Sequence, residues 1–190
     1  MDGLKKLLAG ETSYRLADDI MDKFLSAGEE MRLKGGDILV NAGEFDPNIY
    51  VVKSGIIRFS DMNGESERTF AFGSAGTMFV SKHSFVKRLP SYYQIDACCD
   101  TTLLRIPNKH YWYMVENYNE FAQWALWMVY EELFFQEKKN QVINGSAKDR
   151  YMSLLHSRMD LVTNVPQKIL ASYLNVTPQY LCRLKKMLEK

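Results

Sequence analysis

The residues best suited to a chemical role lie near the end of the chain, in the stretch VPQKILASYLNVTPQYLCRLKKM at 165–187. Arg183 has the planar fork that binds guanine in a bidentate manner, and Lys185 and Lys186 offer point charges to phosphate. Residues 145–190 hold 8 Lys or Arg against 3 Asp or Glu, although the whole chain has a net charge of only +1. This charge distribution favours an anionic partner for the segment, with a merely solvated basic face as the alternative.

The spacing within the same stretch predicts a helix-turn-helix. Pro166 begins a first helix that ends at Asn175, and Thr177 caps a second helix that has Pro178 in its first turn. Ala171 is small where two helices must cross closely, and Asn175 stands where a glycine is usual but tolerates a left-handed turn. The alternative is an ordinary helical hairpin. The residues predicted to contact DNA are Gln167, Lys168, Ser172, Thr177, Gln179, Tyr180, Arg183, Lys185 and Lys186.

The elements upstream must position this unit, and they begin with a predicted antiparallel β-domain. Between about residues 30 and 107, short β-branched and aromatic runs alternate with glycines, and Asn63-Gly64 is a hairpin signal. These strands are too short and too closely spaced for βαβ units, so an antiparallel sandwich or barrel is expected. An amphipathic helix is predicted over residues 12–26.

A long helix is predicted over residues 119–144, with apolar side chains on nearly all of its faces. One face can cover the β-domain, and the others must be buried elsewhere. A parallel pair of such helices in a homodimer would bury them, with Phe121, Trp124, Met128 and Phe135 in the interface. A helix held between two domains of one chain is the alternative. Residues 161–164 are expected to connect the next helix, at 147–159, to the helix-turn-helix.

Other chemistries find little support in the sequence. The spacing of Cys98, Cys99 and Cys182 fits neither a disulfide framework nor a zinc site, which indicates a reduced protein. The sequence also shows no signal peptide and no membrane span, so we expect a cytoplasmic protein with no membrane partner. A metal enzyme on a cupin-like barrel would need several converging ligands, and only His83 lies in the β region. We therefore expect no catalytic residues, no metal site and no enzyme activity.

The order of β-domain, long helix and helix-turn-helix resembles the Crp/Fnr (cyclic-AMP receptor protein/fumarate-nitrate regulator) family of bacterial transcription regulators. The resemblance rests on GDILVNAGEFDPNIYVVKSGIIRF at 36–59, GTMF at 76–79 and IDACCDTTLLRI at 95–106. It implies an α+β fold with a β-roll effector domain and N-terminal helix at 1–117, a dimerisation helix at 118–144 and a DNA-binding domain at 145–190 with a reduced or absent wing. It also implies a homodimer on double-stranded DNA and names RNA polymerase as a candidate partner.

The predicted effector pocket departs from the cyclic-nucleotide-binding members of that family. Those members carry a Glu for the ribose and an Arg for the cyclic phosphate, and here Ser81 and Ser91 stand at these positions. Losing the Arg removes the charge-assisted phosphate contact, so we expect no cyclic AMP and either another small effector or none. The pocket candidates are Met78, Phe79, Ser81, Ser91 and Tyr92. An effector-binding or oligomerisation module of the same fold that has lost DNA binding is the alternative function.

Overall fold

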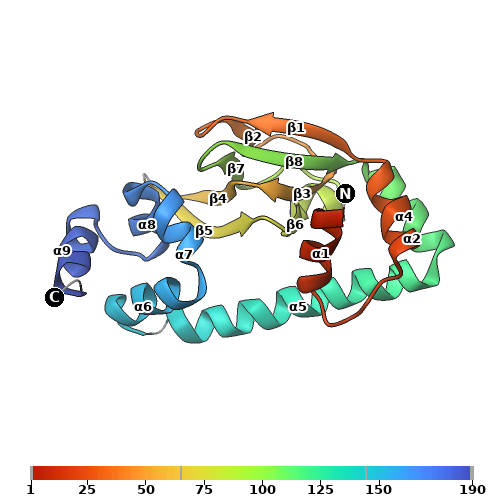
Figure 1. Cartoon of the computed structure of the whole chain (residues 1–190). Coiled ribbons are helices and arrows are strands. Elements are labelled where there is room, and N and C mark those ends of the chain that lie inside the picture. The colour runs from red at the N-terminus through yellow and green to blue at the C-terminus, as the bar shows by residue number, and fades with distance from the viewer. Residues whose placement is uncertain (1, 65, 144, 189–190) are drawn as a thin grey trace.

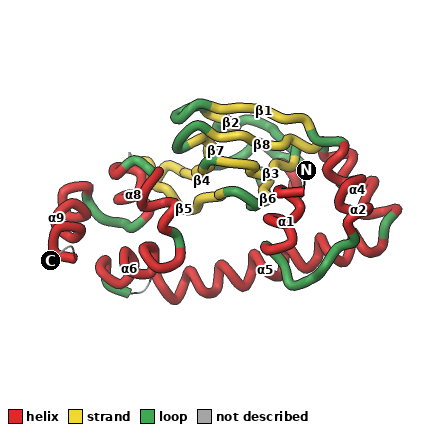
Figure 2. Tube along the Cα trace, in the orientation of Figure 1, coloured by secondary structure: helices red, strands yellow, loops and turns green. Residues whose placement is uncertain are grey.

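The computed structural model describes residues 2–64, 66–143 and 145–188 and shows an α+β chain with its strands in the N-terminal part (Figures 1 and 2). The strands are β1 (Glu29–Leu33), β2 (Ile38–Val40), β3 (Ile49–Ser54), β4 (Ile56–Asn63), β5 (Ser66–Ser74), β6 (Met78–Val80), β7 (Gln94–Ala97) and β8 (Thr101–Ile106). The helices are α1 (Asp2–Gly10), α2 (Asp18–Ser26), α3 (Lys82–Lys87), α4 (Asn108–Asn117), α5 (Asn119–Ile143), α6 (Ala147–Ser157), α7 (Met159–Asn164), α8 (Gln167–Tyr173) and α9 (Pro178–Leu188).

The strands form two antiparallel sheets that face each other as a β-roll. One sheet has the order β1-β8-β3-β6 and the other β2-β7-β4-β5, and neither closes into a barrel. Gly55 carries the chain from one sheet to the other with a φ of 89°. A Cβ at this position would lie 2.6 Å from the carbonyl oxygen of Asp100, so both the backbone conformation and the close approach require glycine.

The run IYVV in β3 is apolar at four successive positions because both faces of its sheet are covered. Tyr50 and Val52 point between the sheets, whereas Ile49 and Val51 point to the helical layer. All four side chains are at most 2% exposed. A strand with one solvated face would alternate apolar and polar residues, so the continuous run marks β3 as a central strand.

Aromatic packing joins the N-terminal helices to α5. The ring of Phe24 on α2 lies 4.8 Å from that of Phe121 and 6.0 Å from that of Trp124, between ring centroids. These three side chains are fully buried. Figure 1 shows α5 running the length of the molecule beneath the roll, from α4 at one end to α6 at the other. Burial of these large rings therefore fixes both the position and the rotation of α5.

A separate apolar core joins the C-terminal helices to the roll. Ile56 of β4 and Cys98, which directly follows β7, pack in one cluster with Leu170 and Ala171 of α8. The rings of Phe72 on β5 and Tyr173 on α8 meet edge to face, with centroids 5.0 Å apart. The C-terminal helices are therefore docked on the β-roll, and Figure 1 shows α9 beyond them at the end of the molecule.

The structure confirms the predicted α+β fold class and corrects several elements. The N-terminal helix begins at Asp18 rather than at residue 12, and α1 precedes it with Leu4 and Leu8 buried on one face. Residues 161–164, expected as a connection, belong to helix α7. The strands β1 and β6 were not predicted. The predicted end of the long helix at Asn144 lies outside the described residues.

From Asn108 to Leu188, the described residues contain helices and connections but no strand. No strand pair therefore flanks the helix-turn-helix within this part of the chain. None of the helices among the described residues is long and apolar enough to cross a membrane.

We predict that Phe24→Ala lowers the free energy of unfolding by about 3–5 kcal/mol, because it leaves a cavity among large buried rings. The matched control is Phe45→Ala, since Phe45 is 49% exposed and Phe24 0%. The control should change stability by no more than about 0.5 kcal/mol. Urea denaturation monitored by circular dichroism measures both, and equal effects would show that α2 does not anchor the helical layer.

Candidate functional site

Helix α9 presents a polar, basic face to solvent. Leu181 and Leu184 are buried against α8 and its neighbours, whereas Gln179, Arg183 and Lys186 are exposed at i, i+4 and i+7 on another face. The guanidinium of Arg183 lies 5.9 Å from the ring centroid of Tyr180, which is itself 40% exposed. Residues 178–188 contain no Asp or Glu, so nothing on this helix opposes its positive charge.

The turn between α8 and α9 has the hydrogen bonds that the sequence pattern requires. The Asn175 N–H donates to the carbonyl of Ser172 and the Val176 N–H to that of Ala171, both at 3.0 Å, which is a Schellman arrangement. Asn175 takes the left-handed conformation with a φ of 53°. The hydroxyl of Thr177 then accepts the Tyr180 N–H at 3.2 Å and caps α9. The two helices therefore meet in a helix-turn-helix.

The structure places the predicted DNA-contacting residues in three different settings. Lys168, Gln179, Tyr180, Arg183 and Lys186 are exposed. Gln167 is also exposed but donates to the carbonyl of Pro178 at 3.3 Å, and Thr177 serves as the cap. Lys185 is half-buried, with its ammonium 6.0 Å from the ring centroid of Tyr151.

Ser172 does not fit its predicted role as a phosphate contact. Its hydroxyl accepts the Thr69 N–H at 3.0 Å and donates to the carbonyl of Glu67 at 3.2 Å. Both partners are backbone groups of β5. Ser172 therefore attaches α8 to the β-roll in this structure, and the prediction is corrected accordingly.

Aromatic side chains fill the region between the sheets where a Crp/Fnr-like effector pocket was expected. Phe79 stacks on Tyr50 at 5.4 Å and meets Phe59 edge to face at 5.3 Å, between centroids. Tyr93 lies 5.4 Å from Phe70. The Tyr50 hydroxyl donates to Asp46 at 2.6 Å, and burial, followed by this carboxylate, raises the pKa of Tyr50. The interior is therefore packed with rings whose polar atoms have partners within the chain.

The five predicted pocket residues are not brought together around one space. Met78 packs against the helical layer and Phe79 lies between the sheets. Ser81 and Ser91 are buried, and their hydroxyls donate to Ser84 Oγ and to the Tyr93 carbonyl at 3.3 and 2.8 Å. Tyr92 is 64% exposed on the surface, so its assignment to an internal pocket was wrong.

Lys82 and Arg88, two cations close to Ser91 along the chain, do not take the place of the missing Arg. Lys82 at the start of α3 pairs with Glu132 of α5, with Nζ 2.8 Å from Oε1, so it faces the long helix. Arg88, at the end of α3, is exposed and has a left-handed φ of 57°. Neither cation lies among the residues that pack between the sheets.

The exposed apolar face of α5 is not the one predicted for the dimer. Phe121 and Trp124 are fully buried and Met128 packs against the same core, so these three residues serve the chain's own interior. Phe135 is 49% exposed. Within residues 119–139 of α5, the large apolar side chains that are exposed are Leu126, Trp127, Val129, Tyr130, Leu133, Phe134 and Phe135. Leu126, Tyr130 and Leu133 are four and then three residues apart, and this helical spacing in the sequence could have indicated the exposed apolar stripe.

The sequence analysis also missed a buried ion-pair network on β4, β5 and β7. Arg58 is 7% exposed and its Nε donates to both oxygens of Asp96, at 2.8 and 3.0 Å. Its Nη1 donates to Glu67 at 3.0 Å, as does the Ser60 hydroxyl. Partial burial raises the pKa of Glu67, but these hydrogen bonds and the Arg58 charge lower it overall. The network closes on itself and carries no free reactive group.

The cysteines and histidines form no site in the described part of the chain. Burial raises the pKa of the Cys98 thiol to about 12, so this thiol is inert at neutral pH. The Nδ1 of His83 donates to the Pro90 carbonyl at 2.6 Å. Among the described residues no group of three or more His, Cys, Asp or Glu is placed to hold a metal ion.

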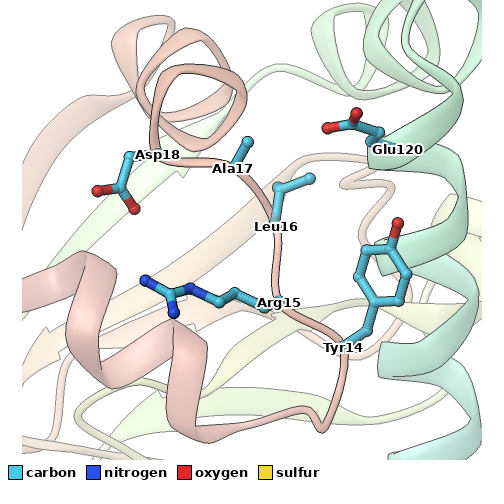
Figure 3. Close-up of a pocket in the computed structure, with 6 residues that line it drawn as sticks. All are labelled: Tyr14, Arg15, Leu16, Ala17, Asp18 and Glu120. Atoms are coloured by element: carbon cyan, nitrogen blue, oxygen red, sulfur yellow. The ribbon is translucent and has the colours of Figure 1, made fainter.

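A shallow hollow between the α1–α2 connection and the start of α5 offers no chemistry either. Figure 3 shows Arg15 and Asp18 extending to one side of it, whereas Glu120 of α5 lies on the other. Tyr14 turns toward α5, where its hydroxyl donates to Gln123 at 3.0 Å. The lining has no nucleophile beside a base.

Comparison with known proteins agrees with this architecture. Residues 30–118 match the family model of the cyclic nucleotide-binding domain. The solved structures that resemble the chain include catabolite activator protein from Thermus thermophilus, with TM-score 0.59 and 18% identity, covering 96% of this chain and 86% of that one. FixK2 from Bradyrhizobium japonicum has TM-score 0.72 and 16% identity, with 85% and 84% covered.

A third similar structure is CLP from Xanthomonas campestris, described as a c-di-GMP responsive global regulator. It has TM-score 0.68 and 15% identity, with 91% of this chain and 92% of that one covered. No curated protein sequence matches the chain. Residues 30–118 thus resemble a cyclic nucleotide-binding domain, and the chain has the fold of Crp/Fnr-type regulators, which confirms the resemblance.

We predict that Asn175→Gly changes the free energy of unfolding by less than about 1 kcal/mol, because glycine adopts the left-handed turn without a Cβ clash. Asn175→Val should lower the free energy of unfolding by about 1–2 kcal/mol, because a β-branched side chain clashes with the backbone in the left-handed conformation. Gln179→Val, at an exposed helical position, controls for the general effect of a β-branched residue. Thermal and urea unfolding measure the three variants, and a neutral Asn175→Val would contradict the turn geometry.

Proposed function

We propose that the chain is a dimeric, sequence-specific DNA-binding regulator whose β-roll does not bind cyclic AMP. The observation that carries this proposal is the exposed face of α9, where Gln179, Arg183 and Lys186 lie on a capped helix free of acidic residues. An arginine and an amide on such a face can read base edges in the major groove, and the lysine can contact phosphate. Figure 1 shows α9 at the end of the molecule, where no part of the roll covers it.

The exposed stripe on α5 supports a dimer formed by a second copy of the chain. Leu126, Tyr130 and Leu133 are 52–56% exposed, and Trp127 and Phe134, seven residues apart, widen the stripe on one side. Their spacing is that of a helical seam, and a contiguous apolar face of this kind is unusual on a monomer. Two copies related by a twofold axis along α5 would present two α9 helices, and reading successive major grooves requires them about 34 Å apart.

The β-roll interior supports the absence of cyclic AMP. The cyclic phosphate would need a charge-assisted partner, and Ser91 instead directs its hydroxyl to the Tyr93 carbonyl. The rings of Tyr50, Phe59 and Phe79 occupy the space between the sheets in mutual contact. A nucleotide could enter only by displacing this aromatic cluster.

A module that has lost DNA binding is the second candidate, and one observation favours it. The hydroxyl of Ser172 is bonded to β5, so the roll holds one residue of the helix-turn-helix that was expected to face DNA. The cap at Thr177 and the exposed Arg183 argue against loss, because a degenerate helix-turn-helix has no need to keep them. DNA selection distinguishes the two candidates.

We expect repeated selection from random duplex DNA to yield an enriched motif that the wild-type protein binds with strong salt dependence. Arg183→Ala should weaken binding to that motif by about 1–3 kcal/mol, that is, about 5- to 150-fold, and relax one base position. Lys186→Ala should weaken binding to all DNA sequences. It should also reduce the slope of log affinity against log salt concentration by about 1 for the lost phosphate contact. Fluorescence anisotropy measures each affinity.

The control for these variants is Lys109→Ala, because Lys109 is exposed on α4, far along the chain from the helix-turn-helix. It should bind DNA like the wild type. If selection enriches no motif, the regulator is excluded in favour of the module without DNA binding. If a motif is enriched but Arg183→Ala binds it as well as Lys109→Ala does, Arg183 does not read the motif and the proposed role of α9 is wrong.

We predict that Tyr130→Glu or Leu133→Glu converts the dimer to monomer in sedimentation equilibrium, since each buries a carboxylate in the apolar seam. Tyr92→Glu, a change at a 64% exposed position on the roll, should leave the dimer intact. Circular dichroism must show that the variants are folded. An unchanged dimer mass for both seam variants, or a monomeric wild type, would refute the proposed interface.

A further inference from the structure

Different elements of the chain lie on the two sides of the exposed stripe on α5. Glu131 directly follows Tyr130 of the stripe, whereas Glu132 directly precedes Leu133 of the same stripe. Because successive residues of an α-helix are turned by about 100°, these two carboxylates lie on opposite sides of the stripe. Each carboxylate binds a different segment, and these bonds show what flanks the stripe on each side.

The connection between α1 and α2, residues 11–17, lies on the Glu131 side. The N–H and the hydroxyl of Ser13 donate to Glu131 Oε1 at 3.2 and 2.9 Å, and the Tyr14 hydroxyl donates to Gln123 at 3.0 Å. Trp127 is four residues from each of these two attachment points on α5, and it is 44% exposed. Figure 1 shows this connection passing beside α5.

Helix α3 lies on the Glu132 side. The Lys82 ammonium at its start is 2.8 Å from Glu132 Oε1. The ring of Phe85 lies 5.3 Å from that of Tyr111, which in turn lies 5.6 Å from that of Phe121, between centroids. Helix α3 therefore runs from the middle of α5 toward the first turns of α5.

The end of α3 presents apolar and cationic side chains that the chain itself does not cover. Val86 and Leu89 are 65% and 49% exposed, and Lys87 and Arg88 are exposed as well. Within the described part of the chain neither of these two cations forms an ion pair. Residues 68–95 contain no Asp or Glu, so no carboxylate nearby in the sequence opposes this charge.

The hollow beside the α1–α2 connection carries the opposite charge. Asp18 and Glu120 line this hollow, and among the described residues neither pairs with a cation. Arg15 lines it too and extends to the same side as Asp18 (Figure 3). Two carboxylates against one guanidinium leave the hollow with a net negative charge.

A twofold axis parallel to α5 brings these two surfaces together. In a parallel helix pair, one flank of each helix faces the other flank of its partner, as e and g positions do in a coiled coil. The α3 of one copy therefore lies beside the α1–α2 connection of the other. Both surfaces are level with the start of α5, since Glu120 belongs to the first turn of that helix and α3 ends beyond Phe85.

We propose that α3 of each copy docks on the α1–α2 connection of the other, with Lys87 and Arg88 facing Asp18 and Glu120. The occupant is a second copy of the chain because the two surfaces continue the exposed stripe and are opposite in charge. The contact rests on the dimer proposed above and extends it to residues outside α5. Residues 11–18 precede the part of the chain that matches the family model, so the family match does not supply this contact.

We expect the double charge reversal Lys87→Glu/Arg88→Glu to weaken dimerisation about tenfold or more, because like charges then meet at two symmetry-related contacts. Asp18→Lys/Glu120→Lys should weaken dimerisation to a similar extent. Sedimentation equilibrium at low ionic strength measures each dimer dissociation constant, and the effect should shrink as salt is added. Circular dichroism checks that each variant is folded.

Mixing the two reversed proteins tests whether the contact forms between copies. A heterodimer has opposite charges at both contacts, since the reversed α3 meets the reversed connection and the native α3 meets the native one. We expect the mixture to dimerise with a dissociation constant within about threefold of that of the wild type. Variants that had only lost their fold could not recover in this way.

The matched control is Arg32→Glu/Lys34→Glu, which changes the net charge by the same amount at two exposed positions on and directly after β1. Figure 1 shows β1 on the side of the roll away from α5, so this variant should dimerise like the wild type.

Two results would overturn the contact and leave the proposed dimer intact. One is that the reversed variants dimerise like the control while Tyr130→Glu still yields monomers. The other is that both reversed variants are weakened and their mixture is not restored, which would place the effect of these charges within one chain. A monomeric wild type would refute the dimer itself, and this contact with it.

Discussion

The burial of Phe121 and Trp124 against Phe24 is the constraint on which the arrangement of the rest depends. A 25-residue helix with apolar side chains on most of its surface has no preferred rotation of its own. Packing three large rings together selects one rotation, and the opposite stripe, with Leu126, Tyr130 and Leu133, is then left in solvent. The same contact thus closes the chain's own core and defines the surface available to a second copy.

A second apolar core determines how far the C-terminal helices depend on the roll. Leu170 and Ala171 of α8 share one cluster with Ile56 of β4 and with Cys98, which directly follows β7. The Ser172 hydroxyl adds two hydrogen bonds to the backbone of β5. Moving the helix-turn-helix away from the roll would break all of these contacts, so the position of α8 depends on that of β5.

The sequence predicted those features that depend on local chemistry. The α8–α9 turn follows from Asn175 and Thr177, and several strands follow from their β-branched runs. What it could not predict depends on long-range packing. The face of α5 that turns inward is decided by Phe24, about a hundred residues away along the chain. Tyr92 and Met78 were placed by analogy with a pocket, whereas strand alternation and the surface loop direct them elsewhere.

The basic surplus of residues 145–190 also divides in a way that composition does not reveal. Arg183 and Lys186 are exposed on α9, whereas Arg150 and Arg158 line a hollow between β5, α6 and α8. Exposed charges attract a polyanion by releasing counterions and tolerate many geometries. The partly buried charges have partners within the chain, since Arg158 pairs with Asp160 and Arg150 donates to the Leu174 and Gly145 carbonyls. One run of positive charge in the sequence therefore divides between an exposed face that suits a polyanion and side chains that hold the C-terminal helices in place.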